Sequence, residues 1–404
     1  MLNTPPEALG SGMRATRSRA RRVALGAAVG VAGALGAAAL ASGLLTVLVA
    51  RAVIVPPSRR TEDVRVVRVD LEHGVITLSA TPDSLLPGTY SFWFDQDAGA
   101  ARLGEIVARD ERTVTRRVLS VEFGDLEAAP SGRFNGWVYL TPDDLATAYE
   151  DVAIRTPLGD APAWLVPADP ARASKRWMIG VHGRAVRRSE VLRAVPVFRD
   201  AGYDSLIVSY RNDGEAPRSA DYRYALGDRE WIDVEEAMRY ALDHGAEELV
   251  LMGWSMGGAT VLQALTRSLY REHVVGVVLE SPVVDWIATL DFQVTLRRLP
   301  AVVRYPVLAM FRSRWGGILT GLAEPLDLDR MDFVRRAREL NSPILLLHSD
   351  DDGFVPSTAS RALAVARPDI VTFVPFDVAR HTKLWNYDPE RWEGAIRAWL
   401  KNLA

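Results

Sequence analysis

A glycine-rich pentapeptide gives the first indication of chemistry. Residues 253–257 read G-W-S-M-G, between an apolar stretch typical of a buried strand, 248–252, and a helix-forming segment, 259–265. A serine at a sharp strand-to-helix turn presents its hydroxyl at the top of a sheet, and the helix N-terminus favours a developing oxyanion. The pattern therefore predicts that Ser255 is a nucleophile. The alternative is an ordinary tight turn that needs glycine.

A serine hydroxyl becomes a good nucleophile only when a base accepts its proton. The chain has six histidines, of which three follow Ser255. Enzymes with this kind of turn use the chain order serine, carboxylate, histidine. The stretch 348–356 reads H-S-D-D-D-G-F-V-P after the apolar segment 344–347, which places acidic residues in a loop, and His381 is the histidine that comes after this loop. We therefore expect His381 to be the general base, with a surface loop histidine as the alternative.

Residues from about 150 to 404 resemble an α/β-hydrolase-fold serine hydrolase. The resemblance is to peptidase-like and esterase-like members that carry G-W-S-M-G-G and a late H-x-x-x-D-x-x-V-P motif, here at 253–258 and 348–356. It implies that Asp352 is the acid, which would hold the histidine tautomer and stabilise the imidazolium. Three other carboxylates stay open as alternatives: Asp350, Asp351 and Asp285.

The resemblance also implies an oxyanion hole made of two backbone N–H groups. The segment 180–183 reads G-V-H-G, which is similar to the family's H-G segment, so the donors would be the N–H groups of Met256 and Arg184. His182 is then expected to have an architectural role. Two positions depart from the family pattern because they lack a glycine: Ser349 and Arg380.

The N-terminal region carries a different signal. Residues 1–22 hold five arginines and one glutamate, a net charge of +4, and the 28 residues of 23–50 contain no charged side chain. Such a stretch is long enough to cross a bilayer, and basic residues before it favour a cytoplasmic N-terminus. We therefore expect a basic cytoplasmic leader at 1–22, a single transmembrane helix at 23–50 in contact with lipid, and a catalytic domain outside the cytoplasm. A cleaved signal peptide, which would export the protein, and a buried helix are the alternatives.

Two kinds of pattern divide the remaining chain. Residues 62–145 contain short β-forming runs separated by Gly, Asp or Pro, which predicts a small β-rich domain that serves as a spacer or as a recognition unit. From about 150 to 404, apolar strands alternate with helices, which predicts an α/β fold with a mostly parallel sheet flanked by helices. The apolar insertion at about 286–335 suits a helical cap.

The composition excludes several other classes of protein. The 404 residues carry 48 basic and 51 acidic side chains, so the net charge of −3 leaves no basic excess for binding nucleic acid. The absence of cysteine excludes a disulfide scaffold, a zinc ribbon and a cysteine nucleophile. The sequence shows no metal-ligand cluster and no glycine loop for a nucleotide, so we expect neither a metal nor a cofactor.

Together these patterns predict a membrane-anchored serine hydrolase. It would cleave an ester or related acyl bond of a small-molecule or peptide-like substrate through an acyl-Ser255 intermediate. A serine aminopeptidase or acylaminopeptidase is the enzymatic alternative, although 62–145 is too short for a propeller of several four-stranded blades. An anchored binding protein that keeps the fold without turnover is the non-enzymatic alternative.

Overall fold

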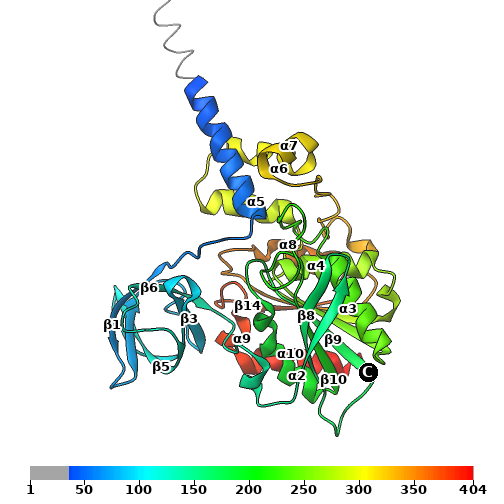
Figure 1. The fold of residues 1–404 in the computed structure, drawn as a ribbon, viewed down its shortest axis with the longest axis horizontal. Helices are drawn as coiled ribbons and strands as arrows, with labels where there is room; N and C mark the ends of the chain where they lie inside the picture. The colour runs from blue at the N-terminus through cyan, green and yellow to red at the C-terminus, as the bar shows by residue number, and fades with distance from the viewer. Residues whose placement is uncertain (1–35, 404) are drawn as a thin grey trace, which may run out of the picture.

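A long apolar helix opens the described part of the chain. The structure, a computed structural model, describes residues 36–403, so the leader expected at 1–22 and the first part of the span expected at 23–50 lie outside the described residues. The helix covers Gly36–Ile54 and is long and apolar enough to cross a membrane. It continues four residues beyond the expected end and includes Arg51. In Figure 1 it rises away from the rest of the protein as a single rod.

A small closed barrel follows the helix (Figure 1, lower left). Its neighbouring strands pair antiparallel in the closed order β1-β2-β5-β4-β3-β6. Closure leaves no unpaired strand edge that could pair with another chain. The strands are β1 (Val64–Asp70), β2 (Val75–Ser79), β3 (Tyr90–Phe94), β4 (Gly99–Arg109), β5 (Thr113–Phe123) and β6 (Ser131–Asn135).

The barrel interior follows from the two-residue period of its strands. Tyr90, Phe92 and Phe94 on β3 all point inward, and Phe92 packs edge-on against Phe134 of β6 at a ring-centroid distance of 5.7 Å. The intervening Trp93 belongs to a separate buried cluster and stacks on Trp137 at 4.8 Å. The β-rich domain expected from the sequence is therefore a barrel with an aromatic core.

One buried cation organises this core. The side chain of Arg116 on β5 is fully buried and lies over the rings of Tyr90 and Phe134, each at 5.4 Å. Burial lowers the pKa of Arg116 to about 10. Its guanidinium donates to the backbone carbonyl of Gly104 and to three carbonyls of the loop 84–88, at distances of 2.6 to 3.0 Å. Arg116 thus fixes the loop that follows Asp83, a residue that reaches the candidate site described below.

We expect Arg116→Met to destabilise the protein by on the order of 3 kcal/mol, because it leaves several buried carbonyls without a donor. Urea denaturation of the purified full-length chain, followed by tryptophan fluorescence, measures this loss. Arg117→Met is the matched control, since the neighbouring side chain is 41% exposed. An equal loss of stability in the two variants would show that the buried hydrogen bonds of Arg116 have no special role.

The second β-structure is an eight-stranded sheet with the order β14-β13-β12-β11-β9-β10-β8-β7. The strands from β9 to β14 pair in parallel, while β7 and β8 form an antiparallel hairpin at one edge. The central strands are buried along nearly their whole length, as expected for parallel strands covered on both faces. The strands are β7 (Glu150–Thr156), β8 (Gly159–Val166), β9 (Arg176–Val181), β10 (Tyr203–Val208), β11 (Glu248–Trp254), β12 (Val274–Glu280), β13 (Ile344–Ser349) and β14 (Val371–Phe376).

Helices cover both faces of the sheet. Apolar side chains of α3 (Trp231–Asp243), α4 (Met256–Arg267) and α8 (Ser357–Ala366) belong to one core cluster. Those of α2 (Val195–Asp200) and α10 (Pro389–Lys401) belong to the other cluster, together with Leu384 of α9 (Leu384–Tyr387). The alternation of strands and helices predicted from the sequence is therefore present, with helices packed on each side.

The described chain also contains short 3₁₀ helices: η1 (Asp95–Asp97), η2 (Pro142–Leu145), η3 (Arg188–Ala194), η4 (Arg271–His273), η5 (Ala301–Val303) and η6 (Ala337–Glu339).

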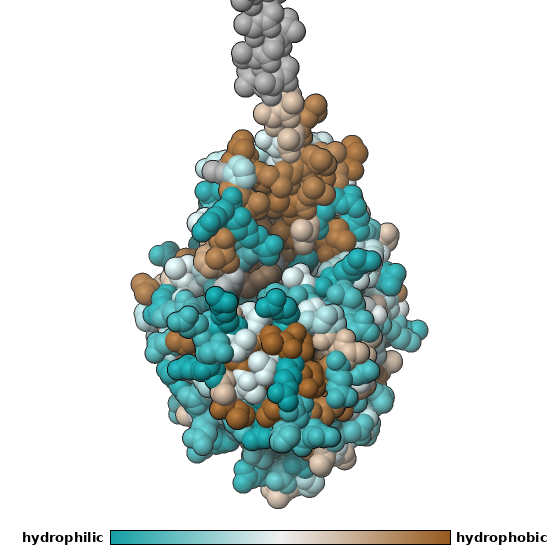
Figure 2. Space-filling model, turned by 90° about the vertical axis from the view of Figure 1, so that its left-hand side faces the viewer, coloured by the Kyte–Doolittle hydropathy of each residue, from teal (hydrophilic) through white to brown (hydrophobic). Residues whose placement is uncertain are grey.

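A helical cap is inserted between β12 and β13. It consists of α5 (Trp286–Leu296), α6 (Arg304–Arg312) and α7 (Arg314–Thr320), and it lies beside the lower part of the N-terminal helix (Figure 1). Six large apolar side chains of the cap are between 41% and 86% exposed, and we call them the apolar collar: Leu296, Val302, Tyr305, Trp315, Ile318 and Leu319. On the face shown in Figure 2, a continuous apolar surface lies at the base of the N-terminal helix.

Candidate active site

The turn between β11 and α4 holds Ser255 in a strained conformation. Its φ of 51° and ψ of −117° are rare for a residue other than glycine. The two flanking glycines are required by close packing: a Cβ on Gly253 would lie 2.6 Å from the carbonyl oxygen of Gly257, and one on Gly257 would lie 2.3 Å from that of Val181. Ser255 directly follows β11, so it lies at the carboxyl end of a central strand. Ligands bind at this end of the strands in sheets of this kind.

Ser255 is the first member of a chain of hydrogen bonds. Its Oγ lies 3.0 Å from Nε2 of His381, and Nδ1 of the same ring lies 2.7 Å from Oδ2 of Asp352. The other oxygen of Asp352 accepts the backbone N–H groups of Phe354 and Val355 at 2.7 and 2.8 Å. The structure thus brings together the serine, acid and base expected from the sequence, in the geometry that a nucleophile and its base need.

The carboxylate of Asp352 is kept ionised. Burial alone would raise the pKa of Asp352, but the charge of His381 and the hydrogen bond from His348 outweigh it and hold the pKa well below its usual value. Nε2 of His348 lies 3.2 Å from Oδ2 of Asp352, and Nδ1 of His348 lies 2.8 Å from Oγ of Ser360. Because the folded-state pKa is depressed, this carboxylate stabilises the fold at neutral pH, and the stabilisation is lost as the pH falls through the folded pKa.

The three alternative acids have other partners. Asp285 caps the N-terminus of α5 by accepting the N–H groups of Ile287 and Ala288. Asp350 forms an ion pair with Arg361 at the surface. Asp351 accepts the N–H groups of Ala379 and Arg380, at 3.0 and 2.8 Å. Among these four carboxylates, Asp352 is the one within hydrogen-bond distance of His381.

The two positions that depart from the family pattern help to hold the histidine loop. Ser349 donates to Asp351 at 2.6 Å and accepts the N–H of Ala379 at 2.9 Å. Arg380 and Thr382, which flank His381, both adopt left-handed backbone conformations with φ of 58° and 51°. These conformations are costly for residues other than glycine, so the surrounding hydrogen bonds must maintain them.

Two backbone N–H groups near Ser255 have no hydrogen-bond acceptor. Within residues 36–403, the N–H groups of Met256 and Arg184 donate to no other residue. Met256 is the first residue of α4, and the N-terminus of a helix supplies free N–H groups and a partial positive charge. The neighbouring N–H of Gly183, in contrast, donates to the buried carboxylate of Glu190 at 2.7 Å. Both donors implied by the resemblance are therefore available.

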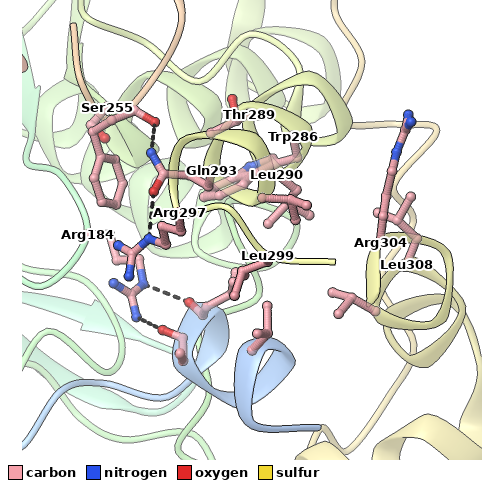
Figure 3. A pocket seen from close by; sticks show the side chains of 16 residues that line it. Arg184, Ser255, Trp286, Thr289, Leu290, Gln293, Arg297, Leu299, Arg304 and Leu308 are labelled. Atoms are coloured by element: carbon pink, nitrogen blue, oxygen red, sulfur yellow. Dashed lines mark hydrogen bonds between the residues drawn. The ribbon is translucent and has the colours of Figure 1, made fainter. Parts of the chain in front are cut away.

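The side chain of Arg184 has a separate role that the sequence did not reveal. Its Nε donates to the carbonyl of Val53 and its Nη2 to that of Ala52, each at 2.7 Å (Figure 3). Nη2 also donates to the carbonyl of Val55 at 3.1 Å. These carbonyls belong to the end of the N-terminal helix, where four carbonyls lack intrahelical partners and a cation is favourable. Arg184 therefore ties the apolar helix to the loop beside Ser255.

We expect Arg184→Met to loosen this attachment, because methionine keeps the backbone N–H and most of the stem but none of the three hydrogen bonds. Hydrogen–deuterium exchange of the amides in 50–56 should become about tenfold faster or more, given the usual strength of hydrogen bonds from a charged group. Arg187→Met serves as the control, since this side chain is 57% exposed and its carboxylate partner is 3.9 Å away. Unchanged exchange in 50–56 would contradict the role of Arg184.

Ser255 lies between two cavities of opposite character. The first, of about 320 Å³, is lined mainly by apolar side chains of the N-terminal helix and the cap, including Val53, Leu290 and Leu308 (Figure 3). The second, of about 350 Å³, is more polar than the first: charged and polar side chains such as Asp83, Asn135 and Lys383 line it, together with apolar residues such as Val186 and Phe354. One side of the serine therefore suits a hydrocarbon group, and the other suits a polar group.

Other buried residues support the site without touching these cavities. Glu280, at the end of β12, accepts the indole N–H groups of Trp254 and Trp392 at 2.9 and 2.8 Å. Burial raises the pKa of Glu280. The sequence carried a signal for this role, because Glu280 is a carboxylate at the end of an otherwise apolar strand. His182 is buried, stacks on Tyr210 at 4.3 Å and contacts Asp213, as expected for an architectural residue.

No three histidine or carboxylate side chains within residues 36–403 are grouped closely enough to hold a metal ion.

Comparison with known proteins identifies the family. A family model described as the alpha/beta hydrolase family matches residues 178–395, which is more than half of the chain and includes Ser255, Asp352 and His381. The chain belongs to the alpha/beta hydrolase family. The expected fold class is therefore confirmed. A second model, for a domain of unknown function (DUF8805), matches residues 65–135, which correspond to the barrel.

Individual relatives are distant from this member of the alpha/beta hydrolase family. Human Protein ABHD12B is 27% identical over 190 residues, which cover 44% of this chain and 46% of the human protein. The chain thus spans about half the length of this curated relative. The esterase Pf2001 of Pyrococcus furiosus matches in two crystal forms with 19% identity and a TM-score of 0.50, over 65% of this chain and 96% or 94% of the esterase. At 19% identity, this structural similarity shows that the two proteins share a fold.

Proposed function

We propose that this protein is a serine hydrolase that cleaves carboxylic esters through an acyl-enzyme intermediate. The observation that carries the proposal is the hydrogen-bonded series Ser255–His381–Asp352 at a strained turn that opens onto both cavities. A strained serine, a base within 3.0 Å and a buried acid would be an unusual combination in a protein that only binds ligands.

In this mechanism Nε2 of His381 accepts the proton of Ser255 Oγ while the oxygen attacks the ester carbonyl. The carbonyl oxygen becomes an oxyanion, which the N–H groups of Met256 and Arg184 stabilise. His381 then gives its proton to the leaving alkoxide, which departs as the alcohol. Water then attacks the acyl-serine carbonyl while His381 accepts a proton from it. As the bond to Ser255 Oγ breaks and the acid is released, His381 returns that proton to Oγ. Asp352 stays ionised throughout, accepts the N–H at Nδ1 and stabilises the imidazolium.

The cavities favour an ester over an aminoacyl substrate. An aminopeptidase needs an acidic group whose negative charge is not balanced by neighbouring cations, so that it can bind the α-ammonium group of its substrate. The two carboxylates lining the polar cavity have cations beside them: Asp83 pairs with Arg380 and Lys383, and Glu190 lies beside Arg193. The apolar cavity beside Ser255, in contrast, matches an acyl chain. An ester with an apolar acyl group is therefore the substrate that both cavities suit best.

We expect a fluorophosphonate probe to label the wild-type protein and to leave Ser255→Ala unlabelled, because the probe reacts with an activated serine. Asp352→Asn should slow labelling by about 10³-fold or more, since an amide no longer holds the required histidine tautomer. Asp350→Asn is the control and should label normally, because Asp350 pairs with Arg361 at the surface.

Two results would refute the proposal that this protein is a serine hydrolase. One is that the wild-type protein is not labelled, and the other is that Ser255→Ala is labelled as strongly as the wild type. The first would favour a binding protein that keeps the fold. A comparison of p-nitrophenyl acyl esters with aminoacyl amides then separates esterase from peptidase activity.

We also propose that the protein is anchored in a membrane by its N-terminal helix, with the cap against the same bilayer. The helix is apolar, and on the face shown in Figure 2 an apolar surface lies at its base, where the cap carries the exposed side chains of the apolar collar. Trp315 and Tyr305 in the collar are residue types enriched where a membrane meets water. The basic leader places the catalytic domain outside the cytoplasm in this proposal. The apolar cavity would then lie close to the lipid, since Val49, Ala52 and Val53 of the helix line it.

We expect residue 318 to contact lipid in the full-length protein reconstituted into vesicles. The chain has no cysteine, so a cysteine in Ile318→Cys can be labelled selectively with an environment-sensitive fluorophore. Its emission should shift to the blue and be quenched by nitroxide-labelled lipids. Leu269→Cys is the control: this side chain is 82% exposed, against 86% for Ile318, but it follows the C-terminal end of α4, away from the cap. Identical behaviour of the two labels would contradict the docking of the cap.

A further inference from the structure

The polar cavity is the place where the barrel meets the candidate active site. Ser255 and His381 form part of its wall, and Asp83, Asn135 and Gly136 from the barrel region form another part. In Figure 1 the barrel lies beside α9, and Asn386 of α9 donates to the carbonyl of Gly136 at 2.8 Å. The barrel therefore completes a cavity that the hydrolase domain alone would leave open.

The contact between the two domains is close at this cavity. A Cβ on Gly136 would lie 2.3 Å from Nη1 of Arg193 and 2.6 Å from the carbonyl oxygen of Thr382, the residue after His381. Only glycine allows the chain that leaves the barrel to pass so near the histidine loop. The glycine at position 136 therefore helps to set the position of the barrel relative to Ser255 and His381, in addition to the other contacts between the two domains.

Charged groups from both domains meet in this cavity. Oδ1 of Asp83 lies 3.4 Å from Nε of Arg380, and Oδ2 lies 3.2 Å from Nζ of Lys383. Burial would raise the pKa of Asp83, but the charges of Lys383 and Arg380 outweigh it and lower the pKa, so the carboxylate is ionised. Asp83 and Arg380 keep about a quarter of their side-chain surface exposed, 24% and 28%. Each can therefore still receive a ligand.

Asn135 adds a donor that has no partner. Its Nδ2 is buried and donates to no other group among the described residues, although the residue lines the cavity. A buried amide without an acceptor costs free energy unless a ligand or water satisfies it. The cavity thus offers a carboxylate that accepts hydrogen bonds beside amide, guanidinium and ammonium groups that donate them. A hydroxyl group both donates and accepts, so a leaving group with several hydroxyls matches this set.

We propose that the barrel is part of the substrate-binding site and that its Asp83 and Asn135 bind the leaving group of the ester, an alcohol that carries further hydroxyl groups. This inference rests on the proposed function. The acyl chain occupies the apolar cavity beneath the cap, the scissile carbonyl lies at Ser255, and the alcohol lies in the polar cavity. The barrel thereby gives the hydrolase its selectivity for the alcohol, without contributing to the covalent steps.

The test compares two butyrate esters that share the acyl group and differ in the leaving group: glyceryl monobutyrate and p-nitrophenyl butyrate. For each, kcat/KM reports the steps up to acylation. Asp83→Asn should lower kcat/KM for the glyceryl ester about tenfold or more, as expected for loss of a charged hydrogen bond, and change it by no more than about twofold for the aryl ester. Asn135→Ala should act in the same direction and covers the case in which Asp83→Asn does not fold.

Equal losses for the two esters in both variants would overturn the inference, because they would show that these residues only position the His381 loop. The matched control is Asp110→Asn, an exposed carboxylate of the barrel at the turn between β4 and β5, which should change neither value. Fluorophosphonate labelling of Ser255 separates failure of this inference from failure of the proposed function. If Ser255 is labelled normally but the variants lose the same activity toward both esters, only the proposed leaving-group site is wrong. If the wild-type protein is not labelled, the proposed serine hydrolase function is wrong.

Discussion

The hydrogen bond between Asp352 and His381 is the interaction on which the candidate site depends. It joins two loops that follow neighbouring parallel strands, β13 and β14, at 2.7 Å. Each loop needs additional support to make this bond: Asp352 is held by two backbone N–H groups, and the histidine loop is held by Asp351 through the amides of Ala379 and Arg380. Because the two strands are parallel, both loops lie at the same edge of the sheet. Two neighbouring acidic residues then have different roles: Asp352 binds His381, and Asp351 holds the loop that carries it.

Three separate parts of the protein converge on Ser255. The sheet supplies the nucleophile and its partners, the N-terminal helix and cap supply an apolar wall, and the barrel supplies a polar wall. Two arginines secure the outer parts by donating to backbone carbonyls. Arg184 binds the end of the N-terminal helix, and Arg116 binds the loop that follows Asp83. A guanidinium suits this task because it has five N–H donors in a fixed plane.

Much of the fold could be predicted from short-range patterns. The hairpin at His73 and Gly74, the strand β3 and the buried strands of the sheet all follow from alternation or from continuous apolar runs. The α/β-hydrolase fold class is confirmed by the family match. The leader at 1–22, the start of the span at 23–50 and the orientation in a membrane stay predictions. So do the domain limits and the catalytic roles of Ser255, Asp352, His381, Met256 and Arg184.

By itself the sequence singled out Ser255 at its glycine turn as the candidate nucleophile and His381, after the acidic residues 350–352, as its candidate base, because both choices depend on residue type and chain order. Only the tertiary structure decided which partner each acidic residue of 350–352 has. Asp352 binds His381, Asp351 accepts an N–H of the histidine loop, and Asp350 forms an ion pair at the surface. Only the tertiary structure revealed the hydrogen bond between Arg184 and Val53 and the ion pair between Asp83 and Lys383. Local sequence cannot encode such pairs, since residues more than a hundred positions apart meet only after sheet, helix and barrel have packed together.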